Sequence, residues 1–164
     1  KISLIIILVF SIFTYSKFDN EELLGKNKLN VLMIDVGQGD SFLIKFPNGK
    51  TALIDAGEAN PFVDNGERVI IPLLDYLGIN QIDYGFISHL DLDHYGGFVS
   101  LIYNKRINKV YRPLPDSGSK SIRLEKFLKE MKIKTGIYDK TTFDVGNVKV
   151  FFLNDPYSYS YRSF

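Results

Sequence analysis

The feature that most constrains this chain is a largely apolar run, residues 82–87, that leads directly into a cluster of metal-ligand side chains. Within six residues the cluster holds both histidines of the chain, His89 and His94, and two carboxylates, Asp91 and Asp93. A short apolar run of this length is typical of a buried strand. We therefore expect a loop at the carboxyl end of a strand to present these four side chains, with the rest of the chain as its scaffold.

The spacing of the four side chains predicts how they share a site. In an extended or loosely turned segment, residues 89, 91 and 93 point to one side. His89 and Asp91 would then hold one cation. The turn expected at Gly96-Gly97 would swing His94 round, so that it holds a second cation with Asp93. Imidazole with carboxylate suits zinc, manganese, iron or nickel, and a metal-bound water becomes a nucleophile for hydrolysis.

An EF-hand calcium loop is the first alternative for so acidic a cluster. That loop requires acidic side chains at its first, third and fifth positions and glutamate at its twelfth. Counted from Asp91, the fifth position is Tyr95 and the twelfth is Ile102, so the pattern fails. A polar surface turn, in which ligand-type residues fall together by coincidence, is the structural alternative.

Composition excludes other chemistries and divides the chain by charge. The 164 residues contain no cysteine, which excludes disulfide partners, a Cys-ligated zinc and a thiol nucleophile. Residues 17–103 carry six Lys and Arg against thirteen Asp and Glu, whereas residues 104–140 carry eleven against four. An acidic half beside a basic half suits a metal site next to a surface for an anionic substrate.

The first sixteen residues differ from the rest of the chain. A lysine followed by an apolar stretch, 4–13, is typical of an export signal, and the stretch is too short to span a bilayer comfortably. We predict a signal peptide or signal-anchor at 1–16, then a polar linker at 17–28. The protein is accordingly expected to be extracytoplasmic, either secreted or held at the membrane by its N-terminal segment.

Periodicity in the remaining chain predicts an α/β domain. Three early runs separated by tight turns indicate an antiparallel meander. Alternating helices and strands follow, and this order predicts helices packed on a sheet. The expected helices are 69–77, ending at Gly78, a segment after Gly97, and an amphipathic helix around 124–131; the expected strands are 30–36, 41–46, 51–54, 82–87, 109–111, 136–138 and 148–153.

The cluster and two further motifs resemble a known family. The pattern His-x-Asp-x-Asp-His at 89–94 is similar to the signature of the metallo-β-lactamase fold superfamily. With Asp-Val-Gly-Gln-Gly-Asp-Ser at 35–41 and Leu-Ile-Asp-Ala-Gly at 53–57, it resembles the ComEC branch, a metallo-hydrolase domain linked to DNA uptake in competent bacteria. The resemblance covers residues 29–155. It implies that the domain, 29–164, is the N-terminal half of a metallo-β-lactamase-like αββα sandwich.

The resemblance also implies roles for individual residues. His89 and Asp91 would ligate the first of two divalent metal ions, zinc or manganese. Asp93 and His94 would ligate the second, and Asp93 would act in catalysis by orienting the attacking water. Asp55 would hold a ligand in place, unless it is simply a turn residue at a strand end.

The motif at 35–41 has a less specific expected role. Asp35, Gln38 and Asp40 would shape the loop beside the site, and an ordinary β-turn accounts for them equally well. The family's later ligands, a further histidine, a bridging aspartate and a last histidine, have no counterpart here because the chain has no third histidine. We therefore expect an incomplete site in a truncated domain, with weak or absent catalysis.

The expected function is that of a metal-dependent hydrolase, specifically a phosphodiesterase or nuclease acting on DNA. The basic segment from Lys120 to Lys132 agrees with an anionic substrate, although the solvent face of an amphipathic helix has the same composition. A hydrolase of another ester or lactam is the alternative among enzymes. A non-catalytic binding module that keeps part of the fold is the alternative outside enzymes.

Overall fold

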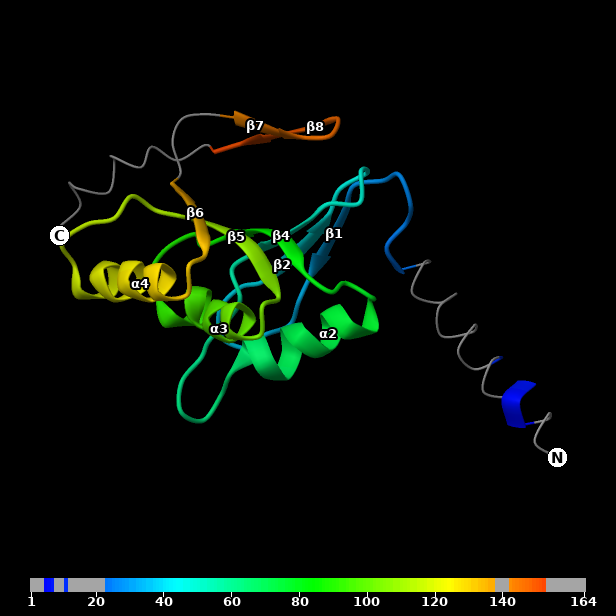
Figure 1. Cartoon of the computed structure of the whole chain (residues 1–164), viewed down its shortest axis with the longest axis horizontal. Coiled ribbons are helices and arrows are strands. Elements are labelled where there is room, and N and C mark those ends of the chain that lie inside the picture. The colour runs from blue at the N-terminus through cyan, green and yellow to red at the C-terminus, as the bar shows by residue number, and fades with distance from the viewer. Residues whose placement is uncertain (1–4, 8–10, 12–22, 138–141, 153–164) are drawn as a thin grey trace.

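A six-stranded mixed sheet forms the centre of the computed structural model, which describes residues 5–7, 11, 23–137 and 142–152 (Figure 1). The strand order is β1-β2-β3-β4-β5-β6. The first three strands pair antiparallel, which confirms the predicted meander, and β3 to β6 pair parallel. The strands are β1 (Asn30–Met33), β2 (Phe42–Lys45), β3 (Thr51–Ile54), β4 (Ile82–Phe86), β5 (Ile107–Arg112) and β6 (Lys134–Ile137).

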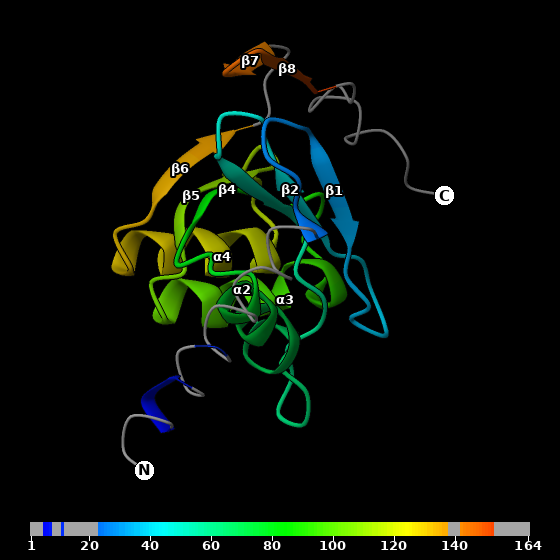
Figure 2. The same ribbon diagram turned by 90° about the vertical axis from the view of Figure 1, so that its right-hand side faces the viewer.

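Helices cover one face of this sheet, and a β-hairpin lies over the other (Figure 1, Figure 2). The helices connect successive parallel strands, which a tight turn cannot join. They are the π-helix η1 (Gly66–Ile70), α2 (Ile71–Tyr76), α3 (Leu92–Tyr103) and α4 (Ser119–Glu130), and the hairpin consists of β7 (Thr142–Val145) and β8 (Val148–Phe151). This arrangement confirms the predicted α/β class.

Two apolar clusters, one on each face of the sheet, hold the layers together. On the helical face, Leu53 of β3 and Phe98 of α3 belong to one cluster and are 0% and 1% exposed. On the hairpin face, the ring of Tyr111 stacks with those of Phe86 and Phe143, at centroid distances of 5.1 and 5.5 Å. Burial of these apolar surfaces is the main force that fixes helices and hairpin on the sheet.

The helix predicted at 69–77 is present as two joined helices, η1 and α2. Pro72 lies inside this continuous segment, although proline lacks a backbone donor and clashes with the preceding turn of an α-helix. It lies in the first turn of α2, where a missing backbone donor is tolerated. The turn before it is a wider π-turn, in which the Ile71 amide donates to the carbonyl of Gly66, five residues back. Gly78 follows the helix with a φ of +67°, as expected of a C-terminal glycine.

The start of α3 corrects the sequence-based expectation. The helix was expected after Gly97, but it begins before the glycine pair and contains it. A Cβ atom on Gly96 would lie 2.3 Å from the amide nitrogen of Ala59, and one on Gly97 would lie 2.2 Å from the carbonyl oxygen of Ala56. The glycines therefore permit a close crossing between helix and loop. The prediction that they form a turn that swings His94 round is wrong.

Several expectations concern segments at the edges of the domain. The predicted signal segment, 1–16, lies mostly outside the described residues, and among the described helices none is long and apolar enough to cross a membrane.

Leu24, within the predicted linker, is 2% exposed and thus packs against the domain. Strand β7 was not predicted, because its four residues contain only two apolar side chains.

Candidate metal centre

The candidate site lies at the carboxyl ends of β3 and β4, which are neighbouring parallel strands. Asp55 directly follows β3, Ser88 and His89 closely follow β4, and His94 lies in the first turn of α3. Loops at the carboxyl ends of adjacent parallel strands converge, and ligand sites of open α/β sheets form there. The strand pairing thus brings together residues that are up to 39 positions apart in the sequence.

Asp55 is the centre of a buried hydrogen-bond network. The residue is 3% exposed. Its Oδ1 accepts from the backbone N–H of Ser88 at 2.8 Å. Its Oδ2 accepts from the Ser88 hydroxyl at 2.6 Å and lies 2.8 Å from Nδ1 of His94. Because the carboxylate meets three donors within the protein, the geometry favours the predicted role of holding a ligand in place.

The backbone around Asp55 is shaped for this contact. Its φ of 53° lies in the left-handed region, which residues other than glycine adopt infrequently and which aspartate tolerates better than most. Strained backbone of this kind gathers at functional sites. The next amide, that of Ala56, donates to the carbonyl of His94 at 2.7 Å. The end of β3 is therefore tied directly to the first turn of α3.

The same network determines which nitrogen each imidazole presents. The Ser88 hydroxyl donates to Asp55 and must therefore accept from Nδ1 of His89, 2.9 Å away. Nδ1 of His94 donates to the Asp55 carboxylate. We infer from these partners that both neutral rings carry their proton on Nδ1 and leave Nε2 as the acceptor. An imidazole in this tautomer is prepared to bind a metal ion through Nε2.

Three ligand-type side chains lie within reach of one metal ion. Ligand atoms of Asp55, His89 and His94 are all within 4.8 Å of one another. The two imidazole rings have centroids 3.8 Å apart. Imidazole nitrogen with carboxylate oxygen is a donor set that suits zinc and manganese, so these residues fit a divalent ion. The sequence assigns the two histidines to separate ions, whereas the structure brings their rings together.

Asp91 lies beside this group and also faces a lysine. It is the N-cap residue of α3, in extended conformation, and its carbonyl accepts from the amide of His94 at 2.9 Å. Its Oδ2 lies 3.5 Å from Nε2 of His89, while its Oδ1 accepts from Nζ of Lys120 at 2.5 Å. The hydrogen bond from Lys120, together with the positive charge of that lysine, holds the pKa of Asp91 below its ordinary value.

Asp93 and the loop between β1 and β2 lie against each other. Asp93 is half-buried in the first turn of α3. A Cβ atom on Gly39, whose φ is +95°, would lie 1.8 Å from the Asp93 carbonyl oxygen. The carbonyl of Asp40 accepts from the Gly57 amide at 3.2 Å, which ties the same loop to the end of β3. The loop between β1 and β2 is therefore placed beside the site, and its site-shaping role stays a prediction.

The other two residues predicted for this loop have local or exposed positions. The carboxylate of Asp35 accepts from the amide of Gly37 at 3.0 Å, a contact that stabilises the turn itself. Gln38 is exposed. The catalytic role of Asp93 and the ligand roles of the four motif residues stay predictions. Sequence reasoning assigned no role to Ser88, although a hydroxyl next to a ligand histidine is a detectable signal.

Fold and site together define a class of protein: an α/β domain with histidines and aspartates gathered at the carboxyl ends of its central strands. Residues 34–153 match the family model of the Metallo-beta-lactamase superfamily. The chain therefore belongs to the Metallo-beta-lactamase superfamily, which confirms the resemblance of its motifs. Members of this superfamily are metal-dependent hydrolases and typically bind divalent metals such as zinc.

The chain is also similar to competence proteins of bacteria. It is 34% identical to "ComE operon protein 3" of Bacillus subtilis (strain 168), over 49% of this chain and 12% of the relative. It is 35% identical to "Competence protein ComA" of Neisseria gonorrhoeae, over 47% of this chain and 10% of the relative. A flavodiiron protein from Giardia intestinalis is 18% identical with a TM-score of 0.46, covering 68% of this chain and 25% of that one.

Proposed function

We propose that this protein is a metal-dependent phosphodiesterase that hydrolyses DNA in the uptake system of competent bacteria. The observation that carries the proposal is the arrangement of charge at the site. A histidine and aspartate cluster suited to a divalent ion is flanked directly by Lys120, the first of the lysines on a basic helix. Two relatives support the role in DNA uptake, because one is named as a competence protein and the other as a ComE operon protein.

Each residue of the site has a separate role in the proposed phosphodiester hydrolysis. Asp55 holds both imidazole rings, one directly and one through Ser88, so that each presents Nε2. His89 and His94 would hold a divalent ion through Nε2, and that ion would supply an acidified water at neutral pH and neutralise charge on the phosphate. We assign to Asp93, the neighbour of His94 in the first turn of α3, the task of orienting the attacking water.

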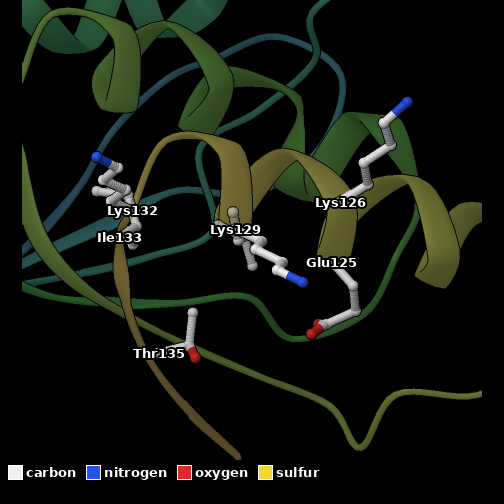
Figure 3. A pocket seen from close by; sticks show the side chains of 7 residues that line it. Glu125, Lys126, Lys129, Lys132, Ile133 and Thr135 are labelled. Atoms are coloured by element: carbon white, nitrogen blue, oxygen red, sulfur yellow. The ribbon is translucent and has the colours of Figure 1, made fainter.

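A basic groove beside α4 supports an anionic polymer as the substrate. The groove has a volume of about 700 Å³, and three lysines, Lys126, Lys129 and Lys132, line it (Figure 3). Phosphates bind such side chains with an affinity that falls as salt rises. Because Lys126 and Lys129 also belong to the solvent face of the amphipathic helix α4, the groove is secondary support for DNA. The full lining is Glu125, Lys126, Leu128, Lys129, Lys132, Ile133 and Thr135.

We further propose an extracytoplasmic location, secreted or anchored in the membrane. The support is the export signal predicted at 1–16 and a composition without cysteine, which is compatible with that environment.

Cleavage of DNA by the Asp93→Ala variant tests the proposed function. We expect the wild-type chain to cleave a fluorescent oligonucleotide only with manganese or zinc. Asp93→Ala should lower the rate by at least about a hundredfold, the order of a lost general acid–base or water-positioning group. The matched control is Asp144→Ala, an exposed carboxylate on β7, which should leave the rate unchanged.

Two outcomes would contradict the proposal. Cleavage that persists in a chelator, or an Asp93→Ala variant as fast as wild type, would exclude the mechanism. Metal binding without cleavage of DNA would favour the non-catalytic binding module, and cleavage of another ester or a lactam instead of DNA would favour a different hydrolase.

A further inference from the structure

Lys120 places an ammonium group directly on the metal-binding loop. Its Nζ donates to Oδ1 of Asp91 at 2.5 Å, across a separation of 29 residues. The other oxygen of the same carboxylate lies 3.5 Å from Nε2 of His89. Asp91 therefore lies between a lysine and the histidine nitrogen that is free to bind a metal ion.

The position of Lys120 follows from the way α4 docks on the sheet. Arg112, at the end of β5, is 6% exposed and donates two hydrogen bonds to the carboxylate of Glu125 on α4, one of them at 2.6 Å. Leu124 and Leu128 of the same helix are 3% and 2% exposed. Because the middle of α4 is fixed in this way, its first turn holds Lys120 beside the metal-binding loop.

The ion pair between Lys120 and Asp91 is one that a metal ion can replace. The two side chains are 55% and 54% exposed, and ion pairs this open to water are weak. A divalent cation carries twice the charge of an ammonium group and can bind a carboxylate and an imidazole together. A metal ion held by Asp91 would therefore deprive the ammonium group of Lys120 of its partner.

A second cation lies next to Lys120. Nε of Arg123 donates to the carbonyl of Ser119 at 3.2 Å, which folds the guanidinium back along the first turn of α4. The hydrogen bond to Asp91 raises the pKa of Lys120, and the positive charge of Arg123 opposes that rise. Lys120 thus lies at the metal-binding loop with a second cation close to it, and cationic side chains of this kind form strong hydrogen bonds to phosphate oxygens.

We infer that Lys120 has one role in the metal-free protein and a different role in the metal-bound protein. In the metal-free protein it is the counter-ion of Asp91. When a metal ion takes its place on that carboxylate, the released ammonium group binds a phosphate oxygen of the substrate. The first role is independent of the proposed phosphodiesterase activity, whereas the second rests on it.

Metal titration of a Lys120→Met variant tests the counter-ion role. Methionine keeps most of the length of the lysine but removes its charge, so manganese no longer competes with an ammonium group for the carboxylate of Asp91. We expect calorimetry to show manganese binding about two- to fivefold tighter than in wild type, in keeping with a weak exposed pair. Lys126→Met, on the same helix and 3.9 Å from Glu130, is the control and should bind manganese like wild type. Unchanged or weaker binding by Lys120→Met would overturn this role.

Phosphate binding to the manganese-saturated proteins tests the anion role. We expect inorganic phosphate to bind Lys120→Met about tenfold more weakly than wild type, the loss expected for one charged hydrogen bond. Lys120→Arg keeps the charge and should bind phosphate within about twofold of wild type. Equal phosphate affinity in wild type and Lys120→Met would overturn the role of Lys120 in anion binding.

Hydrolysis of a thymidine dinucleotide separates this inference from the proposed function. If wild type binds phosphate through Lys120 but does not hydrolyse the dinucleotide with manganese, the phosphodiesterase function fails, and Lys120 is left as a phosphate-binding residue without a role in phosphodiester hydrolysis. If the dinucleotide is hydrolysed with the same KM by wild type and Lys120→Met, the function holds and the anion role fails.

Discussion

A single carboxylate, that of Asp55, reaches both histidines of the site. It meets His94 directly and His89 through the hydroxyl of Ser88. Ser88 therefore contributes to the site, because its hydroxyl connects the buried carboxylate of Asp55 to the more exposed ring of His89 and orients that ring. Mutation of a side chain that orients a metal ligand typically lowers metal affinity or activity by roughly 10- to 100-fold.

Loss of the Ser88 hydroxyl should weaken metal binding without unfolding the protein. In Ser88→Ala, His89 loses the acceptor for Nδ1–H, and Asp55 loses one of its donors. We expect zinc affinity, measured by competition with a chromophoric chelator, to fall about tenfold. Ser88→Thr keeps the hydroxyl and should bind zinc nearly as well as wild type. Equal affinities in all three proteins would show that the hydroxyl does not orient His89.

At the scale of elements, the site depends on how closely α3 approaches the loop after β3. The glycine pair removes two side chains where the helix meets Ala56 and Ala59. Gly66 of η1 lies at the same crossing, because a Cβ atom there would be 2.2 Å from the carbonyl oxygen of Gly97. This tight packing places the first turn of α3, with Asp93 and His94, beside Asp55.

A methyl group at Gly97 should push α3 away from that loop. Alanine favours a helix over glycine by about 1 kcal/mol, but its Cβ would meet backbone atoms, which move only with the loop. Overpacking of this kind costs about 1–3 kcal/mol or more, so we expect Gly97→Ala to lower the free energy of unfolding by about 2 kcal/mol in urea. Leu92→Ala, at an exposed position of the same helix, should change it by less than about 0.5 kcal/mol. A Gly97→Ala variant more stable than wild type would show that the crossing is not tight.

At the scale of the whole molecule, the site joins the end of β3 to a segment that lies 33 to 39 positions later in the sequence. Asp55 comes from the end of β3, Ser88 and His89 come from the end of β4, and His94 comes from α3. The unfolded chain cannot offer this geometry, so a metal ion should bind the folded state preferentially. Binding to the folded state alone raises stability by mass action.

Zinc should therefore raise the melting temperature of the protein. At a concentration one hundred times the dissociation constant, the added stability is about 2.7 kcal/mol, which corresponds to about 5–10 °C for a domain of this size. Thermal melts followed by circular dichroism, with zinc and with a chelator, would measure the shift. His94→Ala should melt at the same temperature in both conditions, and a zinc shift retained in that variant would place the metal elsewhere.

The sequence alone determined most of the elements and the chemistry of the site, because both are largely local properties. Apolar periodicity over neighbouring residues predicted the meander, the helix at 69–77 and the amphipathic helix. The dense spacing of ligand types at 89–94 indicated a metal centre, and its motifs indicated the superfamily. Asp91, a residue type favoured at N-caps, was a signal for the start of α3, but the glycine pair was interpreted as a turn.

Only the tertiary structure decided which distant residues meet at that centre. Parallel pairing of β3 with β4 brings Asp55 to Ser88 and His94, and the docking of α4 brings Lys120 to Asp91. Such contacts depend on the packing of helices on the sheet, which local backbone preference does not encode. Tertiary packing also explains why the glycine pair lies within α3, because another segment of the chain approaches the helix closely at these two positions.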